Sequence, residues 1–333
     1  MDRKFYKKFM TTTQPSIYIV LLHWKNYKDT EQCLLSLKDV TYKNRHIIIV
    51  DNFSNDGSIE KLQQEFPDNK YIYNEDNLGF SCGCNVGIRW ALNDGADFVL
   101  LLNNDTIVEP GFLEPAVNAF SEHKSIGAVT GKIMFMQQPN KIWQAGGYIS
   151  NVRAQGVARG LGEIDIGKYD EICDIGWASG AMSLIAMKTF DQVGLLPEEY
   201  FFGQEEWDFS TAILRNNLRI LYVPTFKSYH AAGGSYRAQN PILNIYGGYL
   251  NKMIYAKKYL PAAFWIPWKT VLWLYLRLYW PYLSKQYATT KREHCILISA
   301  AHLAFADHKR LKRVTRSDLE VAAKKLGVDS SWK

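Results

Sequence analysis

The feature that most constrains this chain is the segment Phe98–Thr106, in which five apolar residues run directly into Asn103, Asn104 and Asp105. Five apolar residues are too few for a buried helix and suit a fully buried strand. A strand of this kind delivers oxygen ligands to the carboxyl edge of a sheet, where open α/β sheets bind ligands. Such ligands suit Mg²⁺ or Mn²⁺ holding a diphosphate, although Asn and Asp also form ordinary polar turns.

Length and composition limit the alternatives. The chain has 333 residues, enough for one large domain or a domain with an appendage, and a net charge of +6. That charge fits anionic small molecules, a membrane surface or nucleic acid. Its five cysteines lack paired metal spacing, which argues against a disulfide framework and favours the cytoplasm. Residues 1–14 are basic without an apolar core, so we expect neither a signal peptide nor a span there.

Strand-like and helix-like segments alternate through the first third of the chain. β-branched or apolar runs predict strands, and apolar residues at helical spacing predict helices between them. The expected strands are 17–22, 47–50 and 71–73, and the expected helices are 30–37, 59–66 and 81–92. This alternation predicts βαβ units and a largely parallel sheet.

Two of the expected strand ends carry polar groups suited to a nucleotide. Asp51 closes the second strand, and its carboxylate can accept from the N3–H of a pyrimidine, or can cap a turn with Ser54. Asn77 and Gly79 open a helix rich in small residues, which admit a close approach by a nucleotide or by a packed helix. The pattern is neither GxGxxG nor a Walker loop.

Together these motifs resemble family 2 glycosyltransferases, closest to the bacterial rhamnosyltransferase-like branch. The resemblance rests on residues 50–58, 75–80, 85–87 and 101–106, and extends over about residues 15–260. It implies an α/β GT-A fold, with a Rossmann-like mixed sheet flanked by helices. We expect a nucleotide-binding half at 15–106, an acceptor half at 107–240, and a helical, aromatic-rich appendage at 241–333.

The resemblance also implies a donor site and a metal site. The position of Asp51 binds the base, and residues 103–105 occupy the family's DxD motif, so Asp105 ligates Mg²⁺ or Mn²⁺ although Asn103 replaces the first acid. A second ligand is expected at His230, although a lone His is more often structural. Ser235, Tyr236 and Arg237 are expected near the phosphates. The expected donor contacts are His23, Trp24, Asp51, Asn77, Gly79, Asn85, Asn103 and Asn104.

The catalytic base is expected among three acids that follow a run of aromatic residues. An inverting transferase needs one base to deprotonate the attacking hydroxyl. The resemblance implies Glu206, with Glu205 and Asp208 as alternatives, while acids at this place also suit a helix start. The acceptor motif is expected at Trp177, Ser179 and Gly180, where Trp177 either stacks on a sugar or packs in the core.

Residues 262–283 are apolar and rich in Trp and Tyr, but Pro267, Lys269, Arg277 and Pro281 interrupt them. We expect an in-plane helix on the inner leaflet, with Trp273, Leu276, Tyr279 and Trp280 facing the lipid. The alternative is a helical core or a subunit interface in a homo-oligomer. Residues 146–168 are expected to form a loop or hairpin, and 307–333 a short exposed helix.

The sequence thus predicts a cytoplasmic, membrane-associated, metal-dependent inverting glycosyltransferase that does not act on nucleic acid. The expected donor is dTDP-L-rhamnose or a UDP-sugar, and the expected acceptor is a glycan or lipid-linked glycan. The missing first acid at Asn103 leaves a catalytically weak glycan-binding or scaffold subunit as the alternative. A Rossmann oxidoreductase fits less well, because no GxGxxG follows the first strand.

Overall fold

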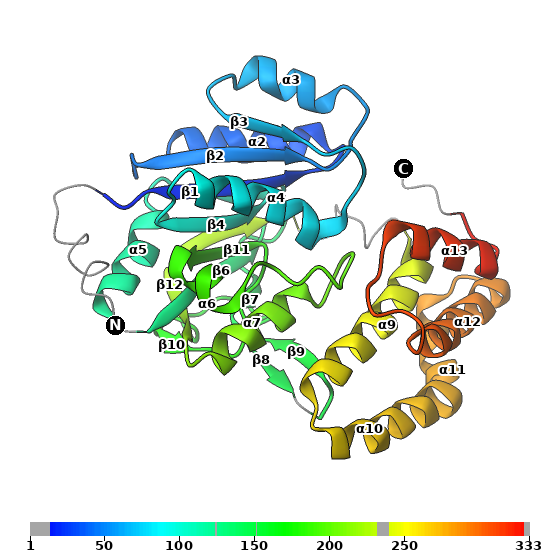
Figure 1. Cartoon of the computed structure of the whole chain (residues 1–333). Helices are drawn as coiled ribbons and strands as arrows, with labels where there is room; N and C mark the ends of the chain where they lie inside the picture. The colour runs from blue at the N-terminus through cyan, green and yellow to red at the C-terminus, as the bar shows by residue number, and fades with distance from the viewer. Residues whose placement is uncertain (1–13, 124, 151, 232–239, 330–333) are drawn as a thin grey trace.

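A computed structural model describes residues 14–123, 125–150, 152–231 and 240–329. Ten strands form a central sheet in the order β10-β12-β6-β11-β4-β1-β2-β3, with β5 paired to β12 and β7 paired to β6 (Figure 1). The strands are β1 (Ile17–His23), β2 (Arg45–Asp51), β3 (Lys70–Tyr73), β4 (Phe98–Asn103), β5 (Thr106–Val108), β6 (Ile126–Phe135), β7 (Ile142–Ala145), β10 (Cys173–Asp174), β11 (Met182–Ala186) and β12 (Arg219–His230). β8 (Gly147–Ser150) and β9 (Gln155–Ala158) form a separate hairpin, inside the segment expected to be a loop or hairpin.

The strands β3, β2, β1 and β4 are parallel neighbours, so their carboxyl ends meet at one edge of the sheet. The register pairs His23 with Asp51, and it pairs Leu22 with Asn103. The chain order reverses between β1 and β4, which is where open α/β sheets bind their ligands. The predicted polar strand ends therefore lie along one edge.

Helices cover both faces of the sheet. One face packs against α2 (Tyr27–Lys38), α3 (Ser58–Glu65) and α5 (Leu113–Glu122). The other face packs against α4 (Gly79–Asn93), α6 (Met187–Val193) and α7 (Glu205–Arg215). Figure 1 shows α2 and α4 on opposite sides of the blue strands. The α/β architecture with a mixed sheet is as predicted.

An irregularity in β12 brings a distant residue to the carboxyl edge of β4. The register of β12 against β6 shifts between Val223 and Lys227, so the strand bulges at this point. Gly131 on β6 makes this possible, because a Cβ there would lie 1.5 Å from the carbonyl oxygen of Phe226. Beyond the bulge, β12 pairs with β5, and His230 lies opposite Thr106.

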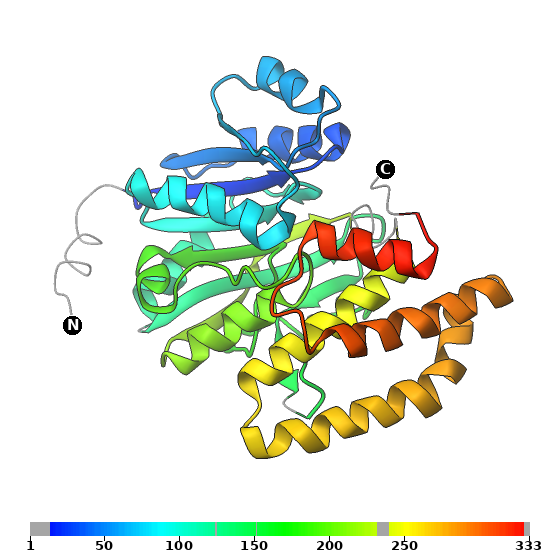
Figure 2. The ribbon, with the colours of Figure 1, turned by 45° about the vertical axis from the view of Figure 1, so that its right-hand side comes forward.

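The C-terminal helices form a hydrophobic core of their own beside the sheet (Figure 2). They are α9 (Pro241–Tyr259), α10 (Ala262–Leu274), the π-helical turn η1 (Tyr275–Tyr279), α11 (Trp280–Leu283), the 3₁₀ turn η2 (Ser284–Tyr287), α12 (Lys291–Asp307) and α13 (Arg316–Leu326). The expectation of an exposed C-terminal helix is wrong for α13. Its residues Leu319, Ala322 and Ala323 are buried against α9 and α12.

The segment 262–283 is helical, but its faces differ from the expectation. Leu276 and Trp280, expected to face lipid, are buried among the C-terminal helices, with only 0% and 5% of their surface exposed. Trp273 and Tyr279, also expected to face lipid, are exposed, with 39% and 52% of their surface accessible. Five further exposed apolar residues form a stripe at spacings of three, four and seven, which is one side of a helix, whereas Ile266 and Trp273 are exposed on another side. This exposed stripe comprises Phe264, Val271, Leu274, Leu278 and Tyr282. Within the described ranges, no helix is both long and apolar enough to cross a membrane.

Candidate active site

The predicted metal ligands Asp105 and His230 are 125 positions apart in sequence numbering yet meet at the carboxyl edge of β4. Asp105 Oδ1 lies 2.9 Å from His230 Nε2, and both side chains are buried. The pairing of β12 with β5 fixes this approach, and the Ala231 N–H donates to the Asp105 carbonyl oxygen at 3.0 Å. The Asn103 Nδ2 is 3.2 Å from His230 Nε2, so all three residues form one cluster.

This cluster fits a divalent cation. Within the part of the chain that the structure describes, Asp105 Oδ1 has no hydrogen-bond donor, although it is buried. Two ligands about 2.1 Å from one ion at a right angle lie roughly 3 Å apart, close to the observed separation. No third His, Cys, Asp or Glu completes an all-protein cage among the described residues. Such a partial set suits Mg²⁺ or Mn²⁺, which take their remaining ligands from phosphates and water.

Asp29 is a residue near this cluster that the sequence analysis did not single out. It lies in the first turn of α2, and burial is the main cause that raises its carboxyl pKa. The negative charge of Asp105 raises this pKa further, while His230 opposes the change, so both groups are close. Its position six residues after the end of β1 was the available signal.

The predicted base is held by the predicted acceptor motif. Glu206 lies in the first turn of α7, and its Oε1 accepts from the Gly180 N–H at 2.8 Å and from the Ser179 hydroxyl at 3.4 Å. The Ala181 carbonyl oxygen in the same turn accepts from the Asn103 N–H at 3.1 Å. Glu206, Ser179, Gly180 and the metal cluster therefore belong to one continuous site.

The two alternative acids lie elsewhere. Asp208 is buried, and its carboxylate accepts from the hydroxyls of Tyr200 and Tyr259 and pairs with Lys258. These contacts make Asp208 a link between α7 and α9. Glu205 is also buried. Burial raises the thiol pKa of Cys84 on α4, and the charge of Glu205 raises it further, which places the Glu205 carboxylate towards the core. Glu206 is the only one of the three that is not buried.

The Trp177 expectation of a sugar-stacking platform is wrong in this structure. Only 7% of Trp177 is exposed, and its indole N–H donates to the Val157 carbonyl oxygen at 3.2 Å. Its ring packs edge-on against Trp207, and it covers Gly147, where any Cβ would lie 2.0 Å from the indole nitrogen. Trp177 is a core residue that braces the hairpin β8–β9.

Several expected donor contacts are structural instead. His23 is fully buried, with Nδ1 2.8 Å from Thr30 Oγ1 and Nε2 2.8 Å from Ser58 Oγ. Burial lowers its pKa from 6.5 to about 4, so the imidazole is neutral at pH 7. Asn85 is also fully buried. Its side-chain amide donates to the Leu196 carbonyl oxygen and accepts from the Leu196 N–H. Direct donor contact is therefore excluded for His23 and Asn85 in this conformation.

The loop after β3 is held in shape by hydrogen bonds to the side-chain amide of Asn77. Asn77 Oδ1 accepts from Asn52 Nδ2 at 2.9 Å and from the Gly79 N–H at 3.0 Å. Gly79 has a φ of +79°, and a Cβ there would lie 2.3 Å from the Phe201 carbonyl oxygen. The nucleotide loop is thereby fastened to the segment that precedes Glu206. Nucleotide contact through Asn77 and Gly79 stays a prediction.

Asp51 lies at the carboxyl end of β2 and is buried, with 5% of its surface exposed. Its carboxylate accepts from the N–H and the hydroxyl of Ser54, as the alternative of a turn cap predicted. Burial raises its pKa, and the Ser54 bonds oppose that rise. A carboxylate has about four lone-pair sites, so an acceptor site remains. Trp24 is half-buried with Lys25 5.2 Å from its ring centroid, and Asn104 donates to Thr30 Oγ1 at 2.8 Å.

The segment after β12 carries the remaining expectations. Ser235, Tyr236 and Arg237, expected near the phosphates, lie outside the described residues. The basic segment expected at 1–14 lies outside them as well, apart from Gln14.

Comparison with known proteins agrees with this fold. Residues 18–181 match the model of glycosyl transferase family 2. The structure of GalNAc-T7 with UDP, GalNAc and Mn²⁺ superposes with a TM-score of 0.59 at 15% identity, covering 95% of this chain and 57% of that one. The fold is therefore GT-A, and the chain is a glycosyltransferase.

Sequence relatives at low identity point to the same class of enzyme. The dTDP-rhamnosyl transferase RfbF of Shigella flexneri is 20% identical over 66% of this chain and 70% of its own length. The N-acetylglucosaminyl-diphospho-decaprenol L-rhamnosyltransferase of Mycobacterium tuberculosis (strain ATCC 25618 / H37Rv) is 24% identical over 60% of this chain and 71% of its own. Residues 18–181 thus form a glycosyltransferase family 2 domain, and the chain is similar to family 2 glycosyltransferases.

Proposed function

We propose that this glycosyltransferase moves a sugar from a pyrimidine nucleoside diphosphate to a glycan or lipid-linked glycan, with inversion at the anomeric carbon. The observation that carries the proposal is the continuous site formed by Asp105, His230, Asn103, the Ser179–Gly180 turn and Glu206. In this site Glu206 takes the proton from the acceptor hydroxyl, because it is the accessible acid and Gly180 and Ser179 fix its carboxylate.

Asp105 and His230 would hold Mg²⁺ or Mn²⁺, which supplies charge to stabilise a departing diphosphate. Asp51 would accept from the N3–H of uracil or thymine. L-Rhamnose is the preferred donor sugar, because two relatives are named for its transfer and one for dTDP-rhamnose. A UDP-sugar is the next choice, supported by the UDP in the GalNAc-T7 structure.

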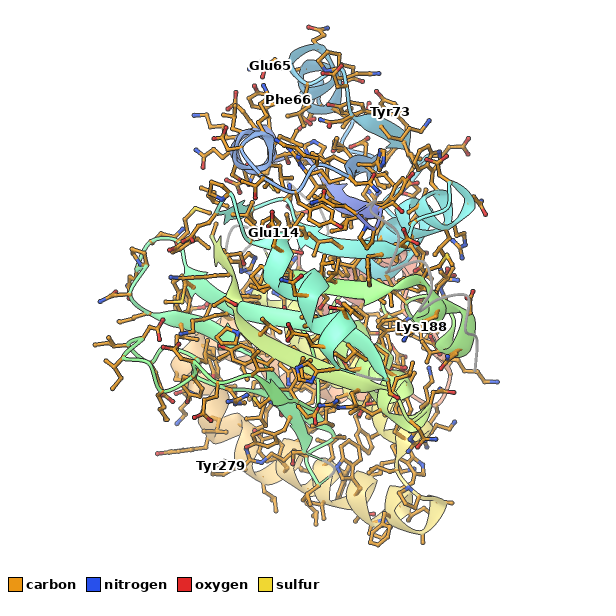
Figure 3. The ribbon with its side chains drawn as sticks, turned by 90° about the vertical axis from the view of Figure 1, so that its left-hand side faces the viewer. Glu65, Phe66, Tyr73, Glu114, Lys188 and Tyr279 are labelled. Carbon is orange, nitrogen blue, oxygen red and sulfur yellow. The ribbon has the colours of Figure 1, made fainter. Side chains whose placement is uncertain are left out.

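The proposal includes attachment to the inner face of the cytoplasmic membrane, where a lipid-linked acceptor in surface polysaccharide synthesis would lie. The exposed stripe on α10, η1 and α11 supports it, because 64% of Phe264 and 74% of Leu278 are exposed. Exposed apolar and aromatic side chains on one helical segment suit the headgroup boundary. Figure 3 shows Tyr279 at the outer edge of the molecule on this same segment. A homo-oligomer would cover the same stripe.

The experiment is calorimetric titration of UDP and dTDP with Mn²⁺, Mg²⁺ or EDTA into wild type, Asp105→Asn and Asp68→Asn. Asp68 is an exposed acid just before β3, at the edge of the sheet opposite to the site, so Asp68→Asn is the matched control. We expect EDTA and Asp105→Asn to weaken binding at least tenfold, and Asp68→Asn to leave it unchanged. Equal affinity with and without metal contradicts the proposal. Tight donor binding without turnover would favour a scaffold subunit, as the replacement of the first acid by Asn103 allows.

A further inference from the structure

A second hollow lies between the β8–β9 hairpin, the start of α7 and the helices α9, α10 and α11. Its volume is about 770 Å³, which is large enough for a ligand of several rings. The family match ends at residue 181, so α7 and the helices that wall this hollow lie outside it. We call it the aromatic groove, because its walls carry Trp207, Tyr249, Trp268, Tyr275, Trp280 and Tyr287.

The groove combines aromatic faces with positive charge. Lys252 on α9 and Arg153 beside β9 both line it. The Lys252 ammonium donates to Gln155 Oε1 at 3.1 Å, and within the described ranges no carboxylate pairs with Lys252. Burial lowers the pKa of Lys252, and the nearby charge of Arg153 lowers it further. Two neighbouring cations without a counter-charge attract an anionic ligand, whose binding would relieve their repulsion.

The two ends of the groove indicate which ligand this is. At one end, Gln204 and Trp207 flank Glu206 in sequence and line the groove, so the groove reaches the first turn of α7. At the other end, Val271 lines the groove and also belongs to the exposed apolar stripe, with 65% of its surface exposed. Aromatic rings, a cation pair and part of the exposed apolar stripe therefore line one hollow that reaches the turn carrying Glu206.

We propose that the aromatic groove binds the acceptor as a sugar joined through a diphosphate to an apolar chain. The sugar packs against the aromatic walls near α7, the diphosphate lies at Lys252 and Arg153, and the chain leaves along the stripe of α10. This inference rests on the proposed function, and it adds a subsite at the C-terminal helices that binds the diphosphate of the acceptor.

The test measures binding by tryptophan fluorescence with two probes, a dodecyl-diphosphate monosaccharide and the uncharged dodecyl glycoside of the same sugar. The variants are Lys252→Met and Arg153→Met, and the control is Lys257→Met, an exposed lysine on the same helix that does not line the groove. Loss of one charge-assisted contact should weaken diphosphate binding about 10- to 100-fold. Glycoside binding and Lys257→Met should be unchanged. Arg153 is exposed, so its variant will fold even if Lys252→Met does not.

The inference is wrong if wild type binds both probes equally, if each variant loses both probes equally, or if Lys257→Met loses as much as Lys252→Met. It is also wrong if the groove is covered by a second copy, which a concentration-dependent mass would show. Binding of UDP and dTDP to the same samples separates the two proposals. If the protein binds UDP or dTDP but binds both lipid probes equally, only the groove proposal is refuted. If it prefers the diphosphate probe but binds neither nucleotide, only the proposed donor site is refuted.

Discussion

Protonation of His23 is expected to destabilise the sheet edge that carries the site. His23 ends β1 and joins Thr30 on α2 to Ser58 on α3, and Thr30 in turn accepts from Asn104 in the metal loop. This side chain therefore connects the loops after β1, β2 and β4. It is fully buried, so a charge on it would have no water to solvate it.

The magnitude follows from the two pKa values. Burial lowers the pKa of His23 from 6.5 to about 4, and the charge of Asp56 only partly opposes this. As the pH falls, the unfolded chain takes up the proton first, so the folded state loses stability. The contribution of neutral His23 is complete above pH 6.5 and falls by about 1.4 kcal/mol per pH unit, to a total loss of about 3 kcal/mol near pH 4.

The assay is urea unfolding of wild type and His23→Gln at intervals from pH 4 to pH 7.5. Gln retains hydrogen-bonding groups and does not titrate, so other titrating groups cancel in the difference between the two curves. We expect wild type to lose about 3 kcal/mol more than His23→Gln over this range. Parallel curves would refute the reasoning, because His23 would then have the same pKa in both states.

Three further predictions concern the nucleotide base of the donor, the membrane and the β12 bulge. Asp51→Asn should weaken UDP and dTDP binding about tenfold and leave the weak binding of GDP unchanged, whereas a wild type that prefers GDP would contradict this assignment. Phe264→Glu with Leu278→Glu should keep the protein in the supernatant with anionic liposomes that pellet wild type, while nucleotide binding survives; equal pelleting argues against the stripe. Gly131→Ala should lower the free energy of unfolding by about 1–3 kcal/mol or more, because its Cβ would meet the Phe226 carbonyl oxygen. Gly111→Ala, whose Cβ would meet nothing within 4 Å, should leave the free energy of unfolding unchanged. Equal unfolding curves for the two variants would contradict the argument from the bulge.

Local sequence patterns predicted the features that depend on strand ends. The apolar run before Asn103 defined β4, and the run before Asp51 defined β2, because a buried strand must stop where polar residues begin. The resemblance then identified Asp105 and His230, which periodicity alone cannot bring together. Their proximity depends on the bulge in β12, and a register shift leaves no signal in residue spacing.

The wrong expectations share a different cause. Leu276 and Trp280 were expected at a surface, and Trp177 either against a sugar or in the core, yet each is buried by an element distant in sequence. An apolar face shows that burial is required, but it does not show whether lipid, sugar or another helix supplies the cover. The same limit applies to His23 and Asn85, whose polar atoms serve neighbouring loops.

The most direct test of the central claim is sugar transfer by Glu206→Gln. The substitution keeps the shape of the side chain and removes its basicity, so turnover should fall by roughly 10²–10⁴-fold while UDP or dTDP affinity stays at the wild-type value. Glu205→Gln, an adjacent buried acid, serves as the comparison and should retain far more activity. Near wild-type turnover by Glu206→Gln, with an inactive Glu205→Gln, would contradict the account.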